Sequence, residues 1–243
     1  RDQTYRDTFK FGGPDTPVTG IATTAFTTLA VIEQAAAAGL NMIVPHEVTW
    51  WSDRDDQSIV AADPIYARKV DLLRRHGMVV FRMHDHAHAR TPDVTFVGSV
   101  RSIGLDPSTE TAPGSHLFVL PETTLGDLAA RIARTSGARA LRVVGDPSAR
   151  VRRVRLGVGY GASALPAGVD VVVTGEMQEA DGAFDSPAYV LDAATAGIPK
   201  GWIVLGHVVS EEPGMRELAE WLGGLVPEVP VRLIESGEPF WVP

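Results

Sequence analysis

The sequence predicts an α/β protein made of two similar halves, in the three-layer α/β/α arrangement, with mixed and largely parallel sheets related by a pseudo-two-fold axis. Short apolar runs alternate with helical patterns along the chain. Strand, helix and strand follow one another closely, which predicts βαβ units. Part of the first half recurs in the second, which predicts that the two halves are similar. With 243 residues, the chain can form one large domain or two small intertwined ones.

The composition excludes several classes of protein. A net charge of −8 argues against a nucleic-acid or anionic-membrane partner, and no apolar run reaches the roughly 18 residues of a membrane span. The chain has no cysteine, so histidine and carboxylate are its strong metal ligands. We expect a cytoplasmic protein. Because the sequence begins at Arg1 without a methionine, an exported form is an open alternative.

The first half contains the first predicted βαβ unit. Residues 1–17 are a polar N-terminal segment with at most a short edge strand, and residues 18–91 form the first half. Strands are expected at 18–23, 40–44 and 78–83, and helices at 27–38 and 66–76. Parallel strands bind ligands beyond their carboxyl ends, and His46 and Glu47 follow such an end.

The remaining chain consists of an intervening segment, residues 92–150, and a second half, residues 151–243. Strands are expected at 95–97, 116–120, 140–144 and 151–158, and a helix at 125–136 capped by Thr123 or Thr124. Three alternating glycines at 157–161 lack the dinucleotide fingerprint, so they predict a close backbone turn and no cofactor site.

Three histidines alternate in the stretch from Arg82 to Arg90. If the backbone stays extended through Ala87, then His84, His86 and His88 project to one face. Imidazoles so close together would repel one another when protonated, and a bound metal would keep them neutral. The alternative is a polar strand end that meets solvent.

The internal repeat extends this hypothesis to the second half. Residues 39–47 align without gaps to residues 168–176, so Glu47 matches Glu176. Residues 79–84 align to 202–207, and a second ligand-type residue follows four positions later in both. We therefore predict that two metal ions roughly 3.5 to 4 Å apart are bound where strand ends from both halves converge. The predicted ligands are His46, Glu47, His84, His88, His207 and Glu211.

The pair His207 and Glu211 has a simpler interpretation, an ion pair at i and i+4 on a helix surface. Their position directly after a very apolar strand favours the ligand role.

Four segments of the chain together resemble the NGG-one-interacting factor three-like family, whose members are often named GTP cyclohydrolase I type 2 homologues. These segments are residues 18–21, 46–47, 170–176 and 206–221. The resemblance covers the chain from about Val18 to the C-terminus and is strongest in the last third. It implies two similar α/β halves, a toroidal homohexamer and a dinuclear metal centre.

The resemblance also implies which positions bind metal. The family's first ligand doublet falls on His46 and Glu47, its last two ligands on His207 and Glu211, and its mid-chain aspartate on His88. The doublet is usually two histidines, so Glu47 is an oxygen ligand where the family has nitrogen. His88 is the reverse, a nitrogen ligand where the family has an aspartate oxygen. The number of ligands is unchanged, and the metal can be Zn, Mn, Fe or Co.

We expect a metal-dependent hydrolase that acts on a small molecule. Glu176 is the candidate general base, with an orienting role behind a metal ligand or a structural hydrogen bond to its own loop as alternatives. Asp85 and His86 are candidate outer partners of the ligands. The alternative function is a non-catalytic metal-binding ring or scaffold, in which protein ligands would close the coordination sphere.

Overall fold

The structure is a computed structural model that describes residues 4–160, 165, 167–177 and 185–243. It divides into two compact units, one of residues 1–97 and 214–236 and the other of residues 98–213 and 237–243. We call them the first and the second unit. Two helices, α4 (Val94–Ser102) and α7 (His207–Leu225), carry the chain from one unit to the other.

The first unit contains a five-stranded sheet in the order β1-β4-β3-β2-β10. Strands β4, β3, β2 and β10 are parallel, and β1 pairs with β4 as an antiparallel edge strand. The elements of this unit, besides α4 and α7, are β1 Phe9–Phe11, β2 Ile21–Thr24, α1 Leu29–Ala37, β3 Met42–Pro45, α2 Pro64–Arg75, β4 Val79–Phe81, α3 Asp85–His88 and β10 Val231–Leu233. The carboxyl ends of the parallel strands share one edge, and His46 and His84 follow two of them.

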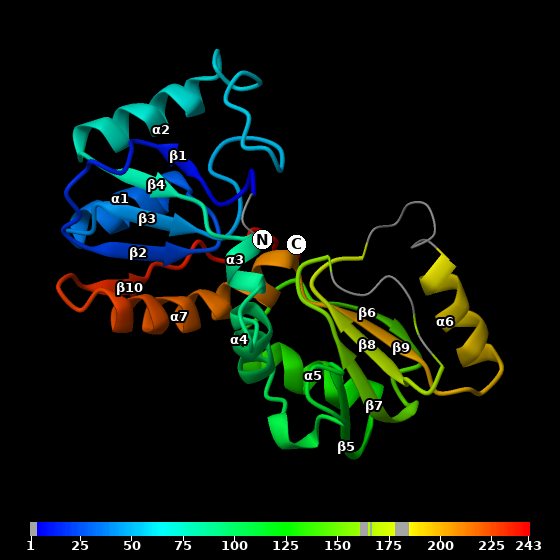
Figure 1. Cartoon of the computed structure of the whole chain (residues 1–243). Helices are drawn as coiled ribbons and strands as arrows, with labels where there is room; N and C mark the ends of the chain where they lie inside the picture. The colour runs from blue at the N-terminus through cyan, green and yellow to red at the C-terminus, as the bar shows by residue number, and fades with distance from the viewer. Residues whose placement is uncertain (1–3, 161–164, 166, 178–184) are drawn as a thin grey trace. The chain divides into compact units, whose positions relative to one another are not determined.

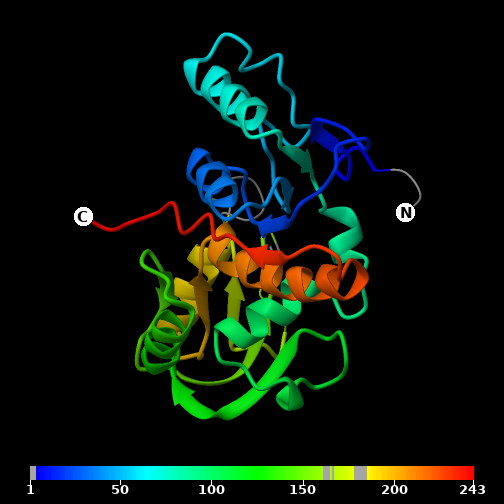
Figure 2. The same ribbon diagram turned by 90° about the vertical axis from the view of Figure 1, so that its left-hand side faces the viewer.

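Helices cover both faces of this first sheet (Figures 1 and 2). Successive strand residues point to opposite faces, so Ile43 packs in the cluster formed with α1 and α2, whereas Val44 packs against Met215 and Leu218 of α7. The first unit therefore has three layers, as the sequence predicted.

The second unit contains another five-stranded sheet, in the order β5-β7-β8-β9-β6. Strands β7, β8 and β9 are parallel, and β5 and β6 are antiparallel edges. Its elements are η1 Pro107–Thr109, β5 Leu117–Thr124, α5 Leu125–Ser136, β6 Arg142–Gly145, β7 Arg150–Leu156, β8 Val171–Thr174, α6 Asp185–Thr195 and β9 Gly201–Val204. Figure 1 shows α5 (green) and α6 (yellow) on opposite faces of this sheet. Both sheets are mixed and largely parallel, which confirms the predicted fold class.

The sequence repeat coincides with the observed strands. Under the ungapped alignment of residues 39–47 with 168–176, β3 falls residue by residue on β8. The alignment of residues 79–84 with 202–207 sets β4 on the last three residues of β9. The helix predicted at 125–136 is also observed over that range, with Thr124 as its N-cap.

The strand predicted at residues 95–97 is wrong. Helix α4 covers these residues, and Val97 N–H donates to Asp93 O at 3.0 Å in the helical i to i+4 pattern. The Asp93 carboxylate accepts the N–H of Thr95 at 2.8 Å and so caps the first turn. This cap outweighs the strand preference of the β-branched residues that follow it.

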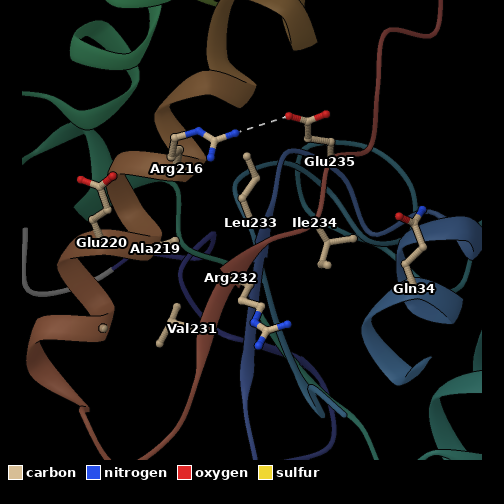
Figure 3. A pocket seen from close by; sticks show the side chains of 10 residues that line it. Gln34, Arg216, Ala219, Glu220, Val231, Arg232, Leu233, Ile234 and Glu235 are labelled. Carbon is tan, nitrogen blue, oxygen red and sulfur yellow. Dashed lines mark ion pairs between the residues drawn. The ribbon is translucent and has the colours of Figure 1, made fainter. Parts of the chain in front are cut away.

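A groove of about 620 Å³ lies between α7 and β10 (Figure 3). Arg216 and Glu235 form an ion pair across it at 3.7 Å. None of the predicted metal ligands lines this groove, so it is not the candidate site.

No helix within the described part of the chain is both long enough and apolar enough to cross a bilayer.

Gly214 of α7 allows the close packing of α7 on the start of α4. A Cβ at this position would lie 2.5 Å from the Thr95 Cα, a backbone atom that cannot move away alone. We expect Gly214→Ala to lower the free energy of unfolding by about 1 to 3 kcal/mol, because the helices must separate. Gly224→Ala on the same helix meets nothing within 4 Å and should stabilise by about 0.5 to 1 kcal/mol. Urea unfolding of both variants checks this, and equal effects would contradict the packing argument.

Candidate metal centre

The two strand ends of the first unit deliver histidines in different ways. His46 comes directly after β3, and its side chain is fully buried. After β4 the chain turns into the short helix α3, with His84 at its N-cap and His88 in its last position. The predicted extended backbone through Ala87 is therefore wrong. Residues four apart share a helix face, so His84 and His88 come together and His86 points away.

The N-terminal segment explains this turn. The Asp7 carboxylate accepts the backbone N–H groups of His84, Asp85 and His86 at 2.8, 3.0 and 2.7 Å. These are the donors that a helix start leaves without intrahelical partners. His86 also contacts Asp7 through Nδ1 at 2.5 Å, and its side chain is 48% exposed. His86 is thus held on the outer side of α3 and lies outside the cluster formed by the other histidines.

Three imidazoles of the first unit form one cluster. The rings of His46 and His84 stack with centroids 4.5 Å apart, and His88 meets each of them edge-on at 4.8 Å. One ligand nitrogen from each ring lies within 4.8 Å of the others. Three protonated rings at this spacing would repel one another strongly, so the arrangement favours neutral imidazoles, which are metal ligands.

An oxygen atom contacts the Nδ1 of each ring in this cluster. The acceptors are Met83 O for His46 at 3.2 Å, Asp85 Oδ1 for His84 at 3.0 Å and Asp93 Oδ2 for His88 at 2.9 Å. A carbonyl or an ionised carboxylate accepts only, so Nδ1 carries the proton and Nε2 presents its lone pair. This is the tautomer that metal-binding histidines use.

The local pKa values agree with that assignment. Burial lowers the pKa of His84 below its usual value, so the ring stays neutral at neutral pH. Burial raises the pKa of Asp85, but hydrogen bonds from Thr4, His84 and Arg6 outweigh burial and the net shift is downward. The pKa of Asp93 is likewise lowered overall, because hydrogen bonds from His88 and Thr95 exceed the effect of burial. Both carboxylates are therefore ionised acceptors.

Glu47 lies beside this cluster and is held by a buried arginine. Its Oε1 is 3.7 Å from His84 Nε2, and its Oε2 accepts from Arg82 Nη2 at 3.1 Å. The Arg82 side chain is 0% exposed and also donates to the carbonyl oxygens of His46 and Asp53 at 3.1 and 2.7 Å. Arg82 thus connects the loop after β3 to the end of β4.

The second unit presents the matching residues in the same strand–turn–helix arrangement. His207 opens α7 after β9, and Glu211 follows one turn later, buried. His207 Nδ1 contacts Glu176 Oε1 at 2.5 Å, and its Nε2 is 2.9 Å from Glu211 Oε2. The burial of Glu211 argues against the surface ion pair. A cation, either a proton or a metal, belongs between an imidazole nitrogen and a carboxylate at this distance.

The glycine turn after β7 packs directly on this pair. Gly159 has φ +55°, and a Cβ there would lie 2.2 Å from Glu211 Oε1 and 3.3 Å from His207 Nε2. Its N–H donates to Ser210 Oγ at 2.9 Å. The predicted backbone turn is observed through Tyr160, whose ring meets His207 edge-on at 5.6 Å. Gly161 lies outside the described residues.

A model of the Duf34/NIF3 family (NGG1p interacting factor 3) matches residues 9–239 of the chain. The chain belongs to this family. A Streptomyces coelicolor protein named GTP cyclohydrolase 1 type 2 homolog is 26% identical over 220 residues, covering 83% of this chain and 76% of the relative.

Two solved structures share the observed fold. The Staphylococcus aureus hypothetical protein SA1388 aligns with a TM-score of 0.71 and 19% identity, over 99% of this chain and 93% of its own. The Bacillus cereus protein related to NIF3 aligns with a TM-score of 0.70 and 15% identity, over 98% and 92%. Identities this low establish the shared fold alone.

Sequence reasoning missed several residues around the site of this NIF3-family chain. Asp93 carries an N-cap signal, an aspartate just before an apolar run, that could have indicated both α4 and a partner for His88. Asp7 and Arg82 carry no such signal, because their partners lie far away in the sequence.

Arg82 offers a test of the charge arrangement. We expect Arg82→Met to lower the free energy of unfolding by about 3 to 5 kcal/mol, because Glu47 loses the buried cation that compensates its charge. Arg68→Met, which removes an exposed arginine paired with Glu33 at 4.0 Å, should change it by less than about 0.5 kcal/mol. Urea unfolding of metal-stripped protein measures both, and similar losses would show that the Arg82 network is unimportant.

Proposed function

We propose that this NIF3-family protein binds divalent metal ions and uses them to hydrolyse a small molecule. The observation that carries the proposal is the cluster of His46, His84 and His88, whose Nδ1 atoms all contact oxygen acceptors. Three histidine nitrogens with an open fourth position are a ligand set of catalytic zinc sites. When bound there, a divalent ion lowers the pKa of a coordinated water and polarises the substrate bond to be cleaved.

The protein's own residues have distinct roles in this proposal. His46, His84 and His88 bind the ion, and Glu47 supplies a neighbouring carboxylate oxygen. Asp85 and Asp93 hold two of the rings in the tautomer and orientation that binding requires.

We further propose that His207 and Glu211 bind the second ion of a dinuclear centre. The support is the sequence repeat, in which these residues match His84 and His88, and the 2.9 Å separation of His207 Nε2 and Glu211 Oε2. Glu176 is then a positioning residue for His207, because its carboxylate accepts from Nδ1 at 2.5 Å. Zn, Mn, Fe and Co all suit such mixed nitrogen and oxygen ligands.

Activity assays separate a hydrolase from a non-catalytic metal-binding protein. Metal-loaded protein is tested first with GTP, since the Streptomyces relative is named for a GTP cyclohydrolase, and then with phosphoesters. Metal-dependent turnover that disappears in His46→Ala supports the hydrolase. Bound metal without turnover of any of these substrates favours a non-catalytic metal-binding protein. We propose that such a protein assembles into a homohexameric ring.

Histidine variants test which rings bind metal. We expect His84→Ala and His88→Ala to lose an ion that wild-type protein retains, because each removes one of three nitrogen ligands. His86→Ala is the matched control on the same short helix, since His86 contacts Asp7 on the outer side, and it should keep the wild-type metal content. Elemental analysis of dialysed protein measures this. Equal metal loss in all three variants would contradict the assignment.

The oxygen partner of His88 can be tested separately. We expect Asp93→Asn to weaken metal affinity roughly 10- to 100-fold, since the ring of His88 loses the charged acceptor that orients it. Asp106→Asn removes a comparable aspartate that caps η1 and should leave affinity unchanged. Competition with a chromophoric chelator gives both constants. An unchanged affinity in Asp93→Asn would reject this role.

A further inference from the structure

The second unit contains a pocket of about 530 Å³ beside His207 and Glu176. Gly175 and Gly206, which follow β8 and β9, are among its lining residues and add no side chains. Phe240 and Trp241 of the C-terminal tail line it as well. This volume lies within the range of small-molecule sites, roughly 300 to 1,000 Å³.

The tail is firmly attached just before these aromatic residues. The Glu238 carboxylate accepts the backbone N–H groups of Arg139 and Ala140 at 2.6 and 3.1 Å, and its side chain is only 7% exposed. One residue earlier, the Gly237 N–H donates to Glu212 at 3.0 Å. Phe240 and Trp241 therefore follow a fixed point of the second unit.

The two aromatic side chains are nevertheless largely exposed. Phe240 is 60% and Trp241 is 71% accessible. Exposed aromatic surface beside a cavity with a few polar groups is typical of a binding site. Aromatic faces bind flat rings by stacking, and this interaction tolerates many different flat rings.

Two charged residues in the lining indicate which hydrogen-bonding groups the ligand carries. Glu176 carries a carboxylate, which accepts hydrogen bonds at both oxygens, and Arg142 of β6 carries a guanidinium, which donates them. A ring that offers N–H donors and carbonyl oxygens at its edge complements both groups.

We propose that this pocket binds a flat nitrogen heterocycle, with its face on Phe240 and Trp241 and its N–H edge toward Glu176. The heterocycle is then the class of substrate on which a metal ion bound by the neighbouring His207 acts, and that part of the inference rests on the proposed function. Binding of the ring itself does not require metal.

Calorimetric titration of the whole chain, after incubation with a divalent metal and dialysis, tests the pocket, with xanthine and uracil as fused and single flat rings. Both should bind saturably. Caffeine, a xanthine in which every ring N–H is methylated, should bind more weakly because it has no hydrogen to donate to Glu176. Trp241→Ala should weaken xanthine binding roughly 5- to 150-fold, the effect of losing one aromatic stacking partner, and Phe240→Ala should weaken it too.

Trp51→Ala is the matched control, because Trp51 is an exposed tryptophan of the first unit and should leave binding unchanged. No saturable binding of either ring, or equal binding by wild-type protein and both tail variants, overturns the pocket. Metal content is measured on the same samples. If wild-type protein holds no metal but binds xanthine through Trp241, the proposed hydrolase is contradicted and the proposed pocket is supported. If the protein retains metal and both tail variants bind xanthine as wild type does, the proposed pocket is contradicted and the metal site is not.

Discussion

Contact between an oxygen acceptor and the Nδ1 atom of each candidate histidine is the interaction on which the candidate metal centre depends. A neutral imidazole has one donor and one acceptor nitrogen, and an acceptor-only partner decides which is which. Four rings have such a partner; they are His46, His84, His88 and His207. For His46, His84 and His88 the lone pair is therefore assigned to Nε2. His207 has a carboxylate oxygen at both ring nitrogens, so a proton or a metal ion belongs between its Nε2 and Glu211. His86 makes the same kind of contact with Asp7 at 2.5 Å, so the contact alone does not identify a metal ligand. What favours metal binding is that the rings of His46, His84 and His88 also pack against one another.

The sequence predicted the parts of the fold that local patterns determine. Apolar runs and glycine stops located most strands and helices within a few residues, and α5 carries both of its own end signals, Thr124 and Gly137. The repeat went further, because β3 coincides with β8 under the alignment. It paired His84 with His207 and His88 with Glu211, and in both halves the pair is separated by one helical turn.

Distant contacts determine what the sequence did not predict. The turn into α3 depends on Asp7, which lies 77 residues before His84, and no local pattern near His84 reveals it. For the same reason the alternating histidines suggested a strand, and His86 was grouped with rings that it does not join. The return of residues 214–236 to the first unit was also missed, because helix α7 crosses the unit boundary without any break in its sequence pattern.

The buried charges around Arg82 are difficult to explain by stability alone. Arg82 is fully buried between Glu47 and Asp53, and buried ion pairs are often no more stable than apolar groups of the same volume. The network does achieve something an apolar core cannot, since it keeps a carboxylate oxygen of Glu47 within 3.7 Å of a histidine nitrogen. An anionic oxygen beside neutral imidazoles is a combination that first-row divalent metals bind well. The cost of burying Arg82 is therefore better understood as a requirement of the site than as a contribution to the fold.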